Sequence, residues 1–209
     1  RLGQIGVQPQ RRGDGAGEMG DALPYVDLGA GRTAKAISGT YRHNCALLDN
    51  DTVKCWGEGA DGSLGQGNNT NRGSAAGQMG DNLPAINLGT GRTATAIYAS
   101  WQSTCAVLDN KTLKCWGRAN EGQLGYGDQV QRGDGPNEMG DNLAAIDFGA
   151  GRTVLSAMSG TLNNCAILDN FQLKCWGYNN DGQLGYGDTL TRGNQPNQMG
   201  ANLLPVVLK

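Results

Sequence analysis

The sequence predicts an all-β fold of β-propeller blades, each made of four antiparallel strands. Three observations support this fold class. The chain of 209 residues repeats with a period of sixty residues, each period holds four short runs of strand character separated by turn-forming residues, and no run has the apolar spacing of a helix. Its 35 glycines also disfavour helices, because glycine gives up the most backbone freedom when it is ordered.

The repeat is defined by motifs that return at the same spacing without insertion or deletion. The phrase KCWG stands at 54–57, 114–117 and 174–177, and GQLGYGD at 122–128 returns unchanged at 182–188. We therefore expect one array over the whole chain, with three complete sixty-residue repeats and partial repeats at both ends. Its expected parts within residues 1–209 are a partial repeat at 1–22, blades at approximately 23–82, 83–142 and 143–202, and an orphan strand at 203–209.

The four strands of a unit are predicted from their residue types and from the turns between them. In the first unit they are LPYVDL (23–28), TAKAIS (33–38), CALLD (45–49) and TVKCW (52–56). The small side chains of the second run suit the narrow end of a blade near a propeller axis. A β-solenoid is the alternative architecture, although solenoid coils usually contain fewer than sixty residues.

Each unit carries two cysteines ten positions apart, which predicts a local disulfide. Cys45 and Cys55 flank a turn centred on Asn50, so direct pairing leaves a three-residue loop, a common hairpin length. Strand residues that face each other without hydrogen bonds have Cα atoms about 4.5 Å apart, a separation that a disulfide accepts. Such a bridge contributes about 3 kcal/mol in the chain-entropy model. The predicted pairs are Cys45–Cys55, Cys105–Cys115 and Cys165–Cys175.

Metal binding and reduced thiols are the alternatives to disulfides for these cysteines. Tetrahedral metal sites favour C-x₂₋₄-C spacing with further Cys or His ligands, whereas this chain has C-x₉-C spacing and a single histidine, His43, so we predict no metal site. In a cytosolic protein the cysteines would instead be close together but reduced. Intact disulfides imply an oxidising compartment, so the predicted location is extracellular or at the cell surface.

A tryptophan follows the second cysteine of each unit. Because side chains alternate along a strand, it points to the face opposite the cysteine. Its identical recurrence favours packing of one blade on the next over stacking on a ligand. The predicted inter-blade residues are Trp56, Trp116 and Trp176.

The combined pattern CALLDNDTVKCWGEGADGSLGQG (45–67) resembles the regulator-of-chromosome-condensation repeat family, and the resemblance covers nearly the whole chain. It implies a seven-bladed β-propeller and non-covalent protein recognition. With its paired cysteines the chain is most similar to an extracellular member of that family. Two features depart from the family pattern: the histidine before Cys-Ala occurs only at His43, and three complete blades fall short of a closed propeller.

Composition and motifs argue against several classes of function. The 17 Lys and Arg residues against 19 Asp and Glu give a net charge of −2, without the basic stripe of a nucleic-acid-binding protein. No apolar stretch has the length of a membrane span. With one histidine and no nucleophile elbow, the chain is expected to be non-enzymatic and to use no cofactor. The oxygen-rich loop at 179–188 lacks the distal glutamate of a calcium loop.

The least repeated segment of each unit precedes its Cys-Ala strand, which makes it a candidate binding rim. It contains Tyr41, Arg42 and Trp101, residue types that are enriched at protein–protein hot spots and that lie on loops here. Sequence drift in unconstrained loops is the alternative explanation.

Candidate N-glycosylation sites occur in three places. Chance alone produces about two such motifs in a chain with this much Asn, Ser and Thr, so their number is weak support. Their position is more informative, because two of them fall at the same predicted hairpin tip, where a glycan would be exposed. The candidate residues are Asn50, Asn68 and Asn110.

Charged positions also repeat. The arginines of the Arg-Thr motif and the aspartates after Met-Gly invite an ion pair between blades, for example Arg92 with Asp81 or Asp141. Exposed ion pairs contribute about 0–1 kcal/mol, so such a pair would set the register of the blades more than their stability.

Two main function hypotheses follow. The first is a structural, self-associating role, in which a secreted, disulfide-stapled glycoprotein forms an extracellular filament, ring or surface assembly by head-to-tail contact with itself. The alternative is a protein-recognition propeller module of a longer chain, which binds other proteins through its loop rim. A GTPase exchange factor is a minor alternative, since paired cysteines and the lack of basic tails fit a nuclear role poorly.

Overall fold

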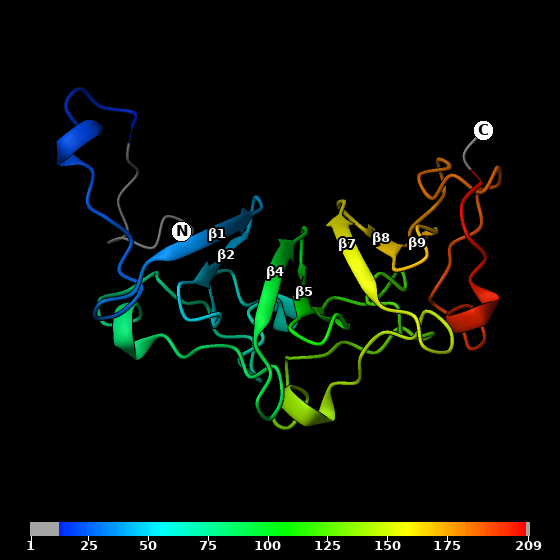
Figure 1. The fold of residues 1–209 in the computed structure, drawn as a ribbon. Helices are drawn as coiled ribbons and strands as arrows, with labels where there is room; N and C mark the ends of the chain where they lie inside the picture. The colour runs from blue at the N-terminus through cyan, green and yellow to red at the C-terminus, as the bar shows by residue number, and fades with distance from the viewer. Residues whose placement is uncertain (1–12, 208–209) are drawn as a thin grey trace.

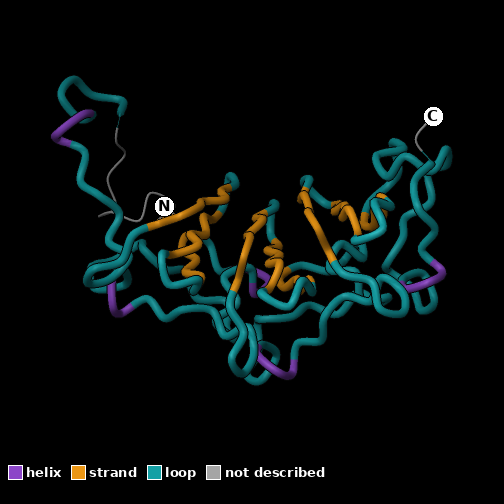
Figure 2. The backbone as a smooth tube through the Cα atoms, viewed as in Figure 1, coloured by secondary structure: helices purple, strands orange, loops and turns teal. Residues whose placement is uncertain are grey.

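The structure is a computed structural model and describes residues 13–207. Its strands form three antiparallel three-stranded sheets, which stand side by side in an open arc (Figure 1). The rest of the described chain is loop with five short 3-10 helices (Figure 2), so the prediction of an all-β fold is confirmed. The strands are β1 (Ala34–Gly39), β2 (His43–Leu48) and β3 (Val53–Gly57), then β4 (Ala94–Ala99), β5 (Ser103–Leu108) and β6 (Leu113–Gly117), then β7 (Val154–Ser159), β8 (Asn163–Leu168) and β9 (Leu173–Gly177). The 3-10 helices are η1 (Gly20–Ala22), η2 (Ala60–Gly62), η3 (Gly80–Asn82), η4 (Gly140–Asn142) and η5 (Gly200–Asn202).

The hairpin between the second and third strands of each sheet is set by local sequence. In the first sheet, Leu48 N donates to Thr52 O (2.9 Å) and Asp51 N donates to Leu48 O (3.0 Å), which closes the three-residue loop. Asp51 has a φ of 65°, the left-handed conformation that such a loop uses at its last position. The loop fixes the register so that Cys45 lies opposite Cys55 in the β2–β3 ladder.

Each sheet has three strands rather than the four we predicted. The run expected as the first strand of each unit forms no strand in the described part of the chain. Ile86 N instead donates a single backbone hydrogen bond to Val53 O (2.8 Å), so this run lies along the outer strand of the preceding sheet. The other copies repeat this bond as Ile146 N to Leu113 O and Val206 N to Leu173 O.

The residues of this run explain why it forms no ladder. In LPAINL (83–88), Pro84 has no N–H to donate to a neighbouring strand, but the copy at 143–148 has Ala144 there and forms no strand either, so proline is not the shared reason. The buried side chains are those of Leu83, Ile86 and Leu88, which do not keep the two-residue alternation of a strand. The orphan strand predicted at 203–209 is likewise extended chain without strand structure as far as residue 207. The partial repeat predicted at 1–22 lies in part outside the described residues.

The hydrophobic core lies between the sheets. Each sheet packs its cysteine-bearing face against the tryptophan-bearing face of the next sheet, as side-chain alternation along the strands requires. At the first junction the buried residues from the two facing sheets are Cys45, Leu47, Val53 and Cys55 on one side and Ala94, Ile97, Ala106, Leu108 and Trp116 on the other.

The tryptophans of KCWG join each sheet to the unit before it. Trp116 Nε1 donates to Ser63 O (3.2 Å), and Trp176 Nε1 donates to Gln123 O (2.9 Å). An added Cβ at Gly65 would lie 2.7 Å from Trp116 Nε1, so the Gly-x-Leu-Gly loop needs glycine there to let the indole approach. Trp56, in the first sheet, is 2% exposed.

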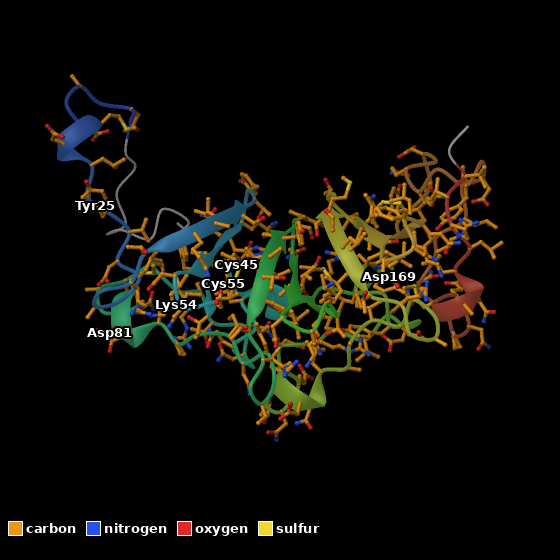
Figure 3. All side chains as sticks on the ribbon, in the orientation of Figure 1. Tyr25, Cys45, Lys54, Cys55, Asp81 and Asp169 are labelled. Atoms are coloured by element: carbon orange, nitrogen blue, oxygen red, sulfur yellow. A yellow bond between two sulfur atoms is a disulfide. The ribbon has the colours of Figure 1, made fainter. Side chains whose placement is uncertain are left out.

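The lysine of KCWG is a buried clamp, because its ammonium group holds two loops together by hydrogen bonds. The sequence pattern did not predict this role. Lys54 Nζ donates to Leu28 O (2.9 Å) and to Gly80 O (2.8 Å), two loops that are distant in sequence. Lys54 and Asp81 lie near each other at the edge of the first sheet (Figure 3). Lys114 and Lys174 make the same pair of bonds in their own units, and burial lowers the pKa of both.

The predicted ion pair of Arg92 with Asp81 or Asp141 is wrong. Arg92 pairs with Asp109 in its own unit, with 3.2 Å between Nη1 and Oδ2. Asp109 follows β5, which pairs with β4, so the two side chains meet at one edge of the sheet. Asp141 instead accepts hydrogen bonds from Thr90 N (2.9 Å) and Thr90 Oγ1 (2.6 Å), which lie in the same sixty-residue unit.

Candidate functional site

One edge of the array carries the turns that join the first and second strands of each sheet. These turns, 40–42, 100–102 and 160–162, lie at the edge toward which β1, β4 and β7 point (Figure 1). Each turn is closed by an equivalent backbone hydrogen bond, such as Thr40 N to His43 O (2.9 Å), and leaves two residues at its tip. We call this edge the rim. The amino-acid sequences of these turn tips differ between units that are otherwise similar. The rim is therefore the part of the array in which the units differ most in sequence.

The structure brings two of the predicted rim residues together across the first junction. The guanidinium carbon of Arg42 lies 5.2 Å from the centroid of the Trp101 ring, and that of Arg118 lies 5.0 Å from it. Such cation–π contacts contribute about 0.5–1 kcal/mol each at exposed sites. We call Arg42, Trp101 and Arg118 the rim site. Tyr41, the third predicted residue, shares the tip with Arg42 and is 81% exposed.

Two further polar side chains hold the guanidinium groups of the rim site. Glu58 forms an ion pair with Arg42, and Gln102 Oε1 accepts a hydrogen bond from Arg118 Nη1 (3.1 Å). The backbone gives these pairs their positions, since Glu58 N donates to Arg42 O and Arg118 N donates to Gln102 O, at 2.9 Å each. The cluster therefore contains two guanidinium groups and one carboxylate, a local charge of +1.

Sequence reasoning missed Glu58 and Arg118, although a signal for them was present. The residue after KCWG differs in every unit (Glu58, Arg118 and Tyr178) while the motif itself does not change. The third unit has Leu162 at its tip and Tyr178 after its motif, so the described chain builds this basic and aromatic arrangement at the first junction.

A buried series of hydrogen bonds begins at His43, the residue that follows Arg42 of the rim site. His43 is fully buried, and its Nε2 lies 2.8 Å from Thr104 Oγ1, which donates its own proton to Ser63 O (2.9 Å). His43 Nε2 is therefore the donor of that contact, and His43 Nδ1 has no hydrogen-bond partner among the described residues. Burial lowers the pKa of His43 to about 4, so the imidazole is neutral near pH 7. These hydrogen bonds connect the first unit to the second beneath the rim turns.

The disulfides join the second and third strands of each sheet, and the second strand also carries the rim turn. The structure joins each predicted pair by a disulfide within one sheet. All six cysteines are buried, the first two pairs between sheets and the third beneath Leu184, Tyr186 and Val206. Figure 3 labels Cys45 and Cys55, the cysteines of the first bridge. The disulfides are Cys45–Cys55, Cys105–Cys115 and Cys165–Cys175, with Cα–Cα separations of 4.1, 4.1 and 4.0 Å.

The candidate glycosylation residues lie away from the rim tips. Asn50 and Asn110 are exposed at the β2–β3 and β5–β6 hairpin tips, on the opposite edge of the sheets. Asn50 Oδ1 accepts a hydrogen bond from Thr52 Oγ1 (2.7 Å), and Asn110 makes the same contact in its own loop. Asn68 is half-buried, and its Nδ2 donates to Gln66 O (3.1 Å). Glycosylation at these residues stays a prediction.

The oxygen-rich loop at 179–188 is organised by protein groups. Asp188 pairs with Arg192 (2.7 Å), whose hydrogen bond lowers the pKa of Asp188 to about 2, and Asn179 Oδ1 accepts from Leu184 N (2.8 Å). Within residues 13–207, no group of three or more His, Cys, Asp or Glu side chains is arranged to hold a metal ion. No helix in the same range has the length and apolar character that crossing a bilayer requires.

Comparisons with known proteins agree with this architecture. Residues 34–66 and 94–123 match the family model described as regulator of chromosome condensation (RCC1) repeat. Human E3 ubiquitin-protein ligase HERC2 is 29% identical over 146 residues, which cover 68% of this chain and 3% of HERC2.

Two solved structures show the same fold at low identity. Human WBSCR16 matches with a TM-score of 0.67 and 19% identity, over 92% of this chain and 44% of that one. Prp20p from Saccharomyces cerevisiae matches with a TM-score of 0.58 and 15% identity, over 77% of this chain and 37% of that one. This chain spans less than half the length of each of these three proteins.

Proposed function

Because the chain belongs to the regulator of chromosome condensation (RCC1) repeat family, we propose that it is a protein-recognition β-propeller module that binds its partner through the rim. The observation that carries this proposal is the contact of Arg42 and Arg118 with Trp101 across two units. Arginine, tryptophan and tyrosine dominate hot spots of protein interfaces, and Tyr41 adds an exposed ring beside them.

The scaffold beneath the rim suits recognition. Binding residues commonly sit on loops that a rigid framework positions, and here each tip is held by a two-stranded ladder with its own disulfide nearby. The fold is also one that meets protein partners, since the Prp20p structure is described with its binding properties to Gsp1p and histones. That description concerns Prp20p and supports protein binding as the class of function for this chain.

Affinity capture with matched variants tests the proposal. The immobilised chain is compared with a double variant, Tyr41→Ala with Trp101→Ala, and with Tyr25→Ala as the control. Tyr25 is 98% exposed and lies on the N-terminal arm, away from the three sheets (Figure 3), so its loss removes an exposed aromatic ring elsewhere. We expect quantitative mass spectrometry to find proteins retained by the wild type and Tyr25→Ala but lost from the double variant. Retention of the same proteins by all three would exclude recognition through the rim.

Head-to-tail self-association is a second candidate, favoured by the outer face of the third sheet. Ile167 on this face is 41% exposed, whereas its counterpart Val107 in the second sheet is 5% exposed beneath the next unit. Tyr186, which with Leu204 lines a cleft of about 570 Å³, packs against Cys165 and Cys175 on the same face. The occupant we propose is the first sheet of a second copy, where Ile37 is 67% exposed.

The opposite end of the array is less open, which places self-association second. Ala46, Leu48 and Trp56 are buried within one chain, although their counterparts in later sheets form junctions between units. Light scattering over a range of protein concentrations tests the association, with Ile167→Lys as the variant that should abolish it. A particle that stays at the monomer mass of 21.9 kDa throughout excludes this candidate.

The proposed module is non-enzymatic and works outside the cell or at its surface. Three disulfides favour an oxidising compartment, because cytosolic thiols are kept reduced. Expression through a secretory pathway followed by glycosidase treatment tests both location and glycans. A mass loss that disappears in Asn50→Gln and Asn110→Gln variants is the expected result, and an unchanged mass excludes N-linked glycans at these positions.

A further inference from the structure

We infer that the rim site recognises an acidic segment of its protein partner, with Arg118 as the residue that binds a glutamate or aspartate carboxylate. The inference rests on the proposed function and names the chemistry of the partner that this function requires. Arg118 differs in its charge partner from most of the other described arginines.

Arg118 is a positive charge without a carboxylate partner in the described chain. Its guanidinium makes one side-chain hydrogen bond, to the neutral amide of Gln102, and its Nε is buried with no partner among the described residues. Most other described arginines are paired with a carboxylate. These paired residues are Arg32, Arg42, Arg92, Arg132, Arg152 and Arg192.

The position of Arg118 prepares it for a ligand. Its guanidinium is held over the Trp101 ring at 5.0 Å, and Gln102, which is 9% exposed, fixes one of its nitrogens. A guanidinium held in this way loses little side-chain entropy when it binds, and its planar fork matches the two oxygens of a carboxylate. Trp101 is half-exposed, so the carbon chain of the bound residue has an apolar surface to lie on.

Arg42 helps to hold the Trp101 ring in place but supplies no free charge for a ligand. Its charge is matched by Glu58, which leaves Arg118 as the unmatched charge of the cluster. Glu58 also rejects ligands that carry several negative charges close together, because a second anionic group would meet its carboxylate. The site therefore suits a single carboxylate with apolar or neutral neighbours better than a phosphate chain.

The charge of the whole chain supports the same choice. With a net charge of −2 the protein repels a polyanion such as nucleic acid at long range, and the rim adds one unmatched positive charge. A single acidic side chain within a protein loop meets the local positive charge without that long-range cost. We therefore choose an acidic protein segment over nucleic acid as the ligand of the site.

Fluorescence titration with synthetic peptides tests the inference directly. The probe is an acetylated and amidated hexapeptide of five glycines and one glutamate, and the control peptide has glutamine in place of glutamate. Trp56, Trp116 and Trp176 are no more than 2% exposed, so a change in tryptophan emission on binding reports Trp101. We expect a saturable change with the glutamate peptide at low salt, and at least tenfold weaker binding of the glutamine peptide.

Three variants locate the binding. Arg118→Gln should weaken binding of the glutamate peptide at least tenfold, and Arg118→Lys should give an intermediate loss because it keeps the charge without the fork. Lys111→Gln removes the same charge from the exposed β5–β6 hairpin tip and should leave binding unchanged. Thermal melting of each variant shows whether it is folded. Equal binding of both peptides, or equal affinity of wild type and Arg118→Gln, would overturn the inference.

The partner capture separates this inference from the function on which it rests. If Arg118→Gln still retains the captured proteins while the Tyr41 and Trp101 double variant loses them, the rim recognises a protein by chemistry other than a carboxylate. If every rim variant retains them, the proposed function itself has failed. Loss of the captured proteins in Arg118→Gln but not in Lys111→Gln supports both.

Discussion

The indole nitrogen of Trp116 donates a hydrogen bond to the carbonyl of Ser63, which belongs to the preceding unit, over 3.2 Å. The contact is possible because Gly65, two residues after Ser63, presents no side chain to the ring. One glycine and one tryptophan thus define how successive sheets meet.

Gly65→Ala should destabilise the chain more than an alanine substitution at an open glycine. Gly65 has a φ of 64°, and its added Cβ would lie 2.7 Å from Trp116 Nε1, so both backbone strain and a clash apply. Gly91→Ala is the matched control, because Gly91 has a φ of 67° and nothing within 4 Å of an added Cβ. We expect a loss of about 1–2 kcal/mol at Gly91 and about 1–3 kcal/mol more at Gly65. Urea unfolding measures both, and equal losses would contradict the role of the close approach.

Lys114→Met should remove a buried clamp. The substitution leaves Leu88 O and Gly140 O without the ammonium that satisfies them, and a buried acceptor without a partner costs about 1–3 kcal/mol. We expect a loss of at least about 2 kcal/mol in the free energy of unfolding. Lys111→Met, at an exposed hairpin tip three residues earlier, should stay within about 0.5 kcal/mol of the wild type. Similar losses at the two lysines would show that Lys114 is not a clamp.

His43 predicts a loss of stability in mild acid. The unfolded chain takes up a proton at this residue below about pH 6.5, whereas burial holds the pKa in the folded chain at about 4. Its contribution is therefore fully present above pH 6.5 and is lost as the pH falls toward 4. The loss reaches about 3 kcal/mol, because one pKa unit corresponds to about 1.4 kcal/mol.

A substitution separates the contribution of His43 to the free energy of unfolding from that of the other titrating groups. Asn stands at the equivalent position of the third unit, Asn163, so His43→Asn keeps a residue type that this fold accommodates. Urea unfolding at pH 7, 6, 5 and 4 gives the two stability curves. Carboxylates affect both curves alike, so the difference between wild type and variant should shrink as the pH falls. Parallel curves would show that the histidine does not resist protonation.

The middle disulfide should contribute measurably to stability. Cys105 and Cys115 close a short loop, with a sequence separation of 10, and such a bridge contributes about 2–4 kcal/mol through the unfolded chain. The double substitution Cys105→Ala with Cys115→Ala is expected to lower the free energy of unfolding by that amount. Urea unfolding of the oxidised wild type and the variant measures the effect. Equal midpoints would mean that packing between the sheets, rather than the bridge, holds this hairpin.

Local features were predictable because short segments determine them. The ten-residue separation of Cys45 and Cys55 and the loop between them fix a hairpin whose strands face each other, and alternation places Trp56 on the other side of the strand. The run predicted as the first strand of each unit forms no strand, for a reason that is partly local. Its buried residues are unevenly spaced, and one hydrogen bond from Ile86 to the preceding sheet remains.

At the rim site, the sequence predicted some of the residues but not the contacts between them. Arg42 and Trp101 were identified by residue type and by their position in an unrepeated segment, but their contact joins residues nearly sixty positions apart. Glu58 and Arg118 were missed because their approach to the tips depends on the antiparallel pairing of strands that precede them.

By itself, the sequence determined the repeat, the all-β class, the cysteine pairs and the residue types available at the rim, since each follows from spacing, alternation or turn chemistry within a few residues. The tertiary structure decided which copy faces which, and so which side chains meet across a junction. Arg42 of the first unit and Arg118 of the second lie over the same Trp101 ring, a contact set by the packing of two units that are near copies in sequence. Contacts between units depend on the relative placement of whole sheets, and no local pattern records that placement.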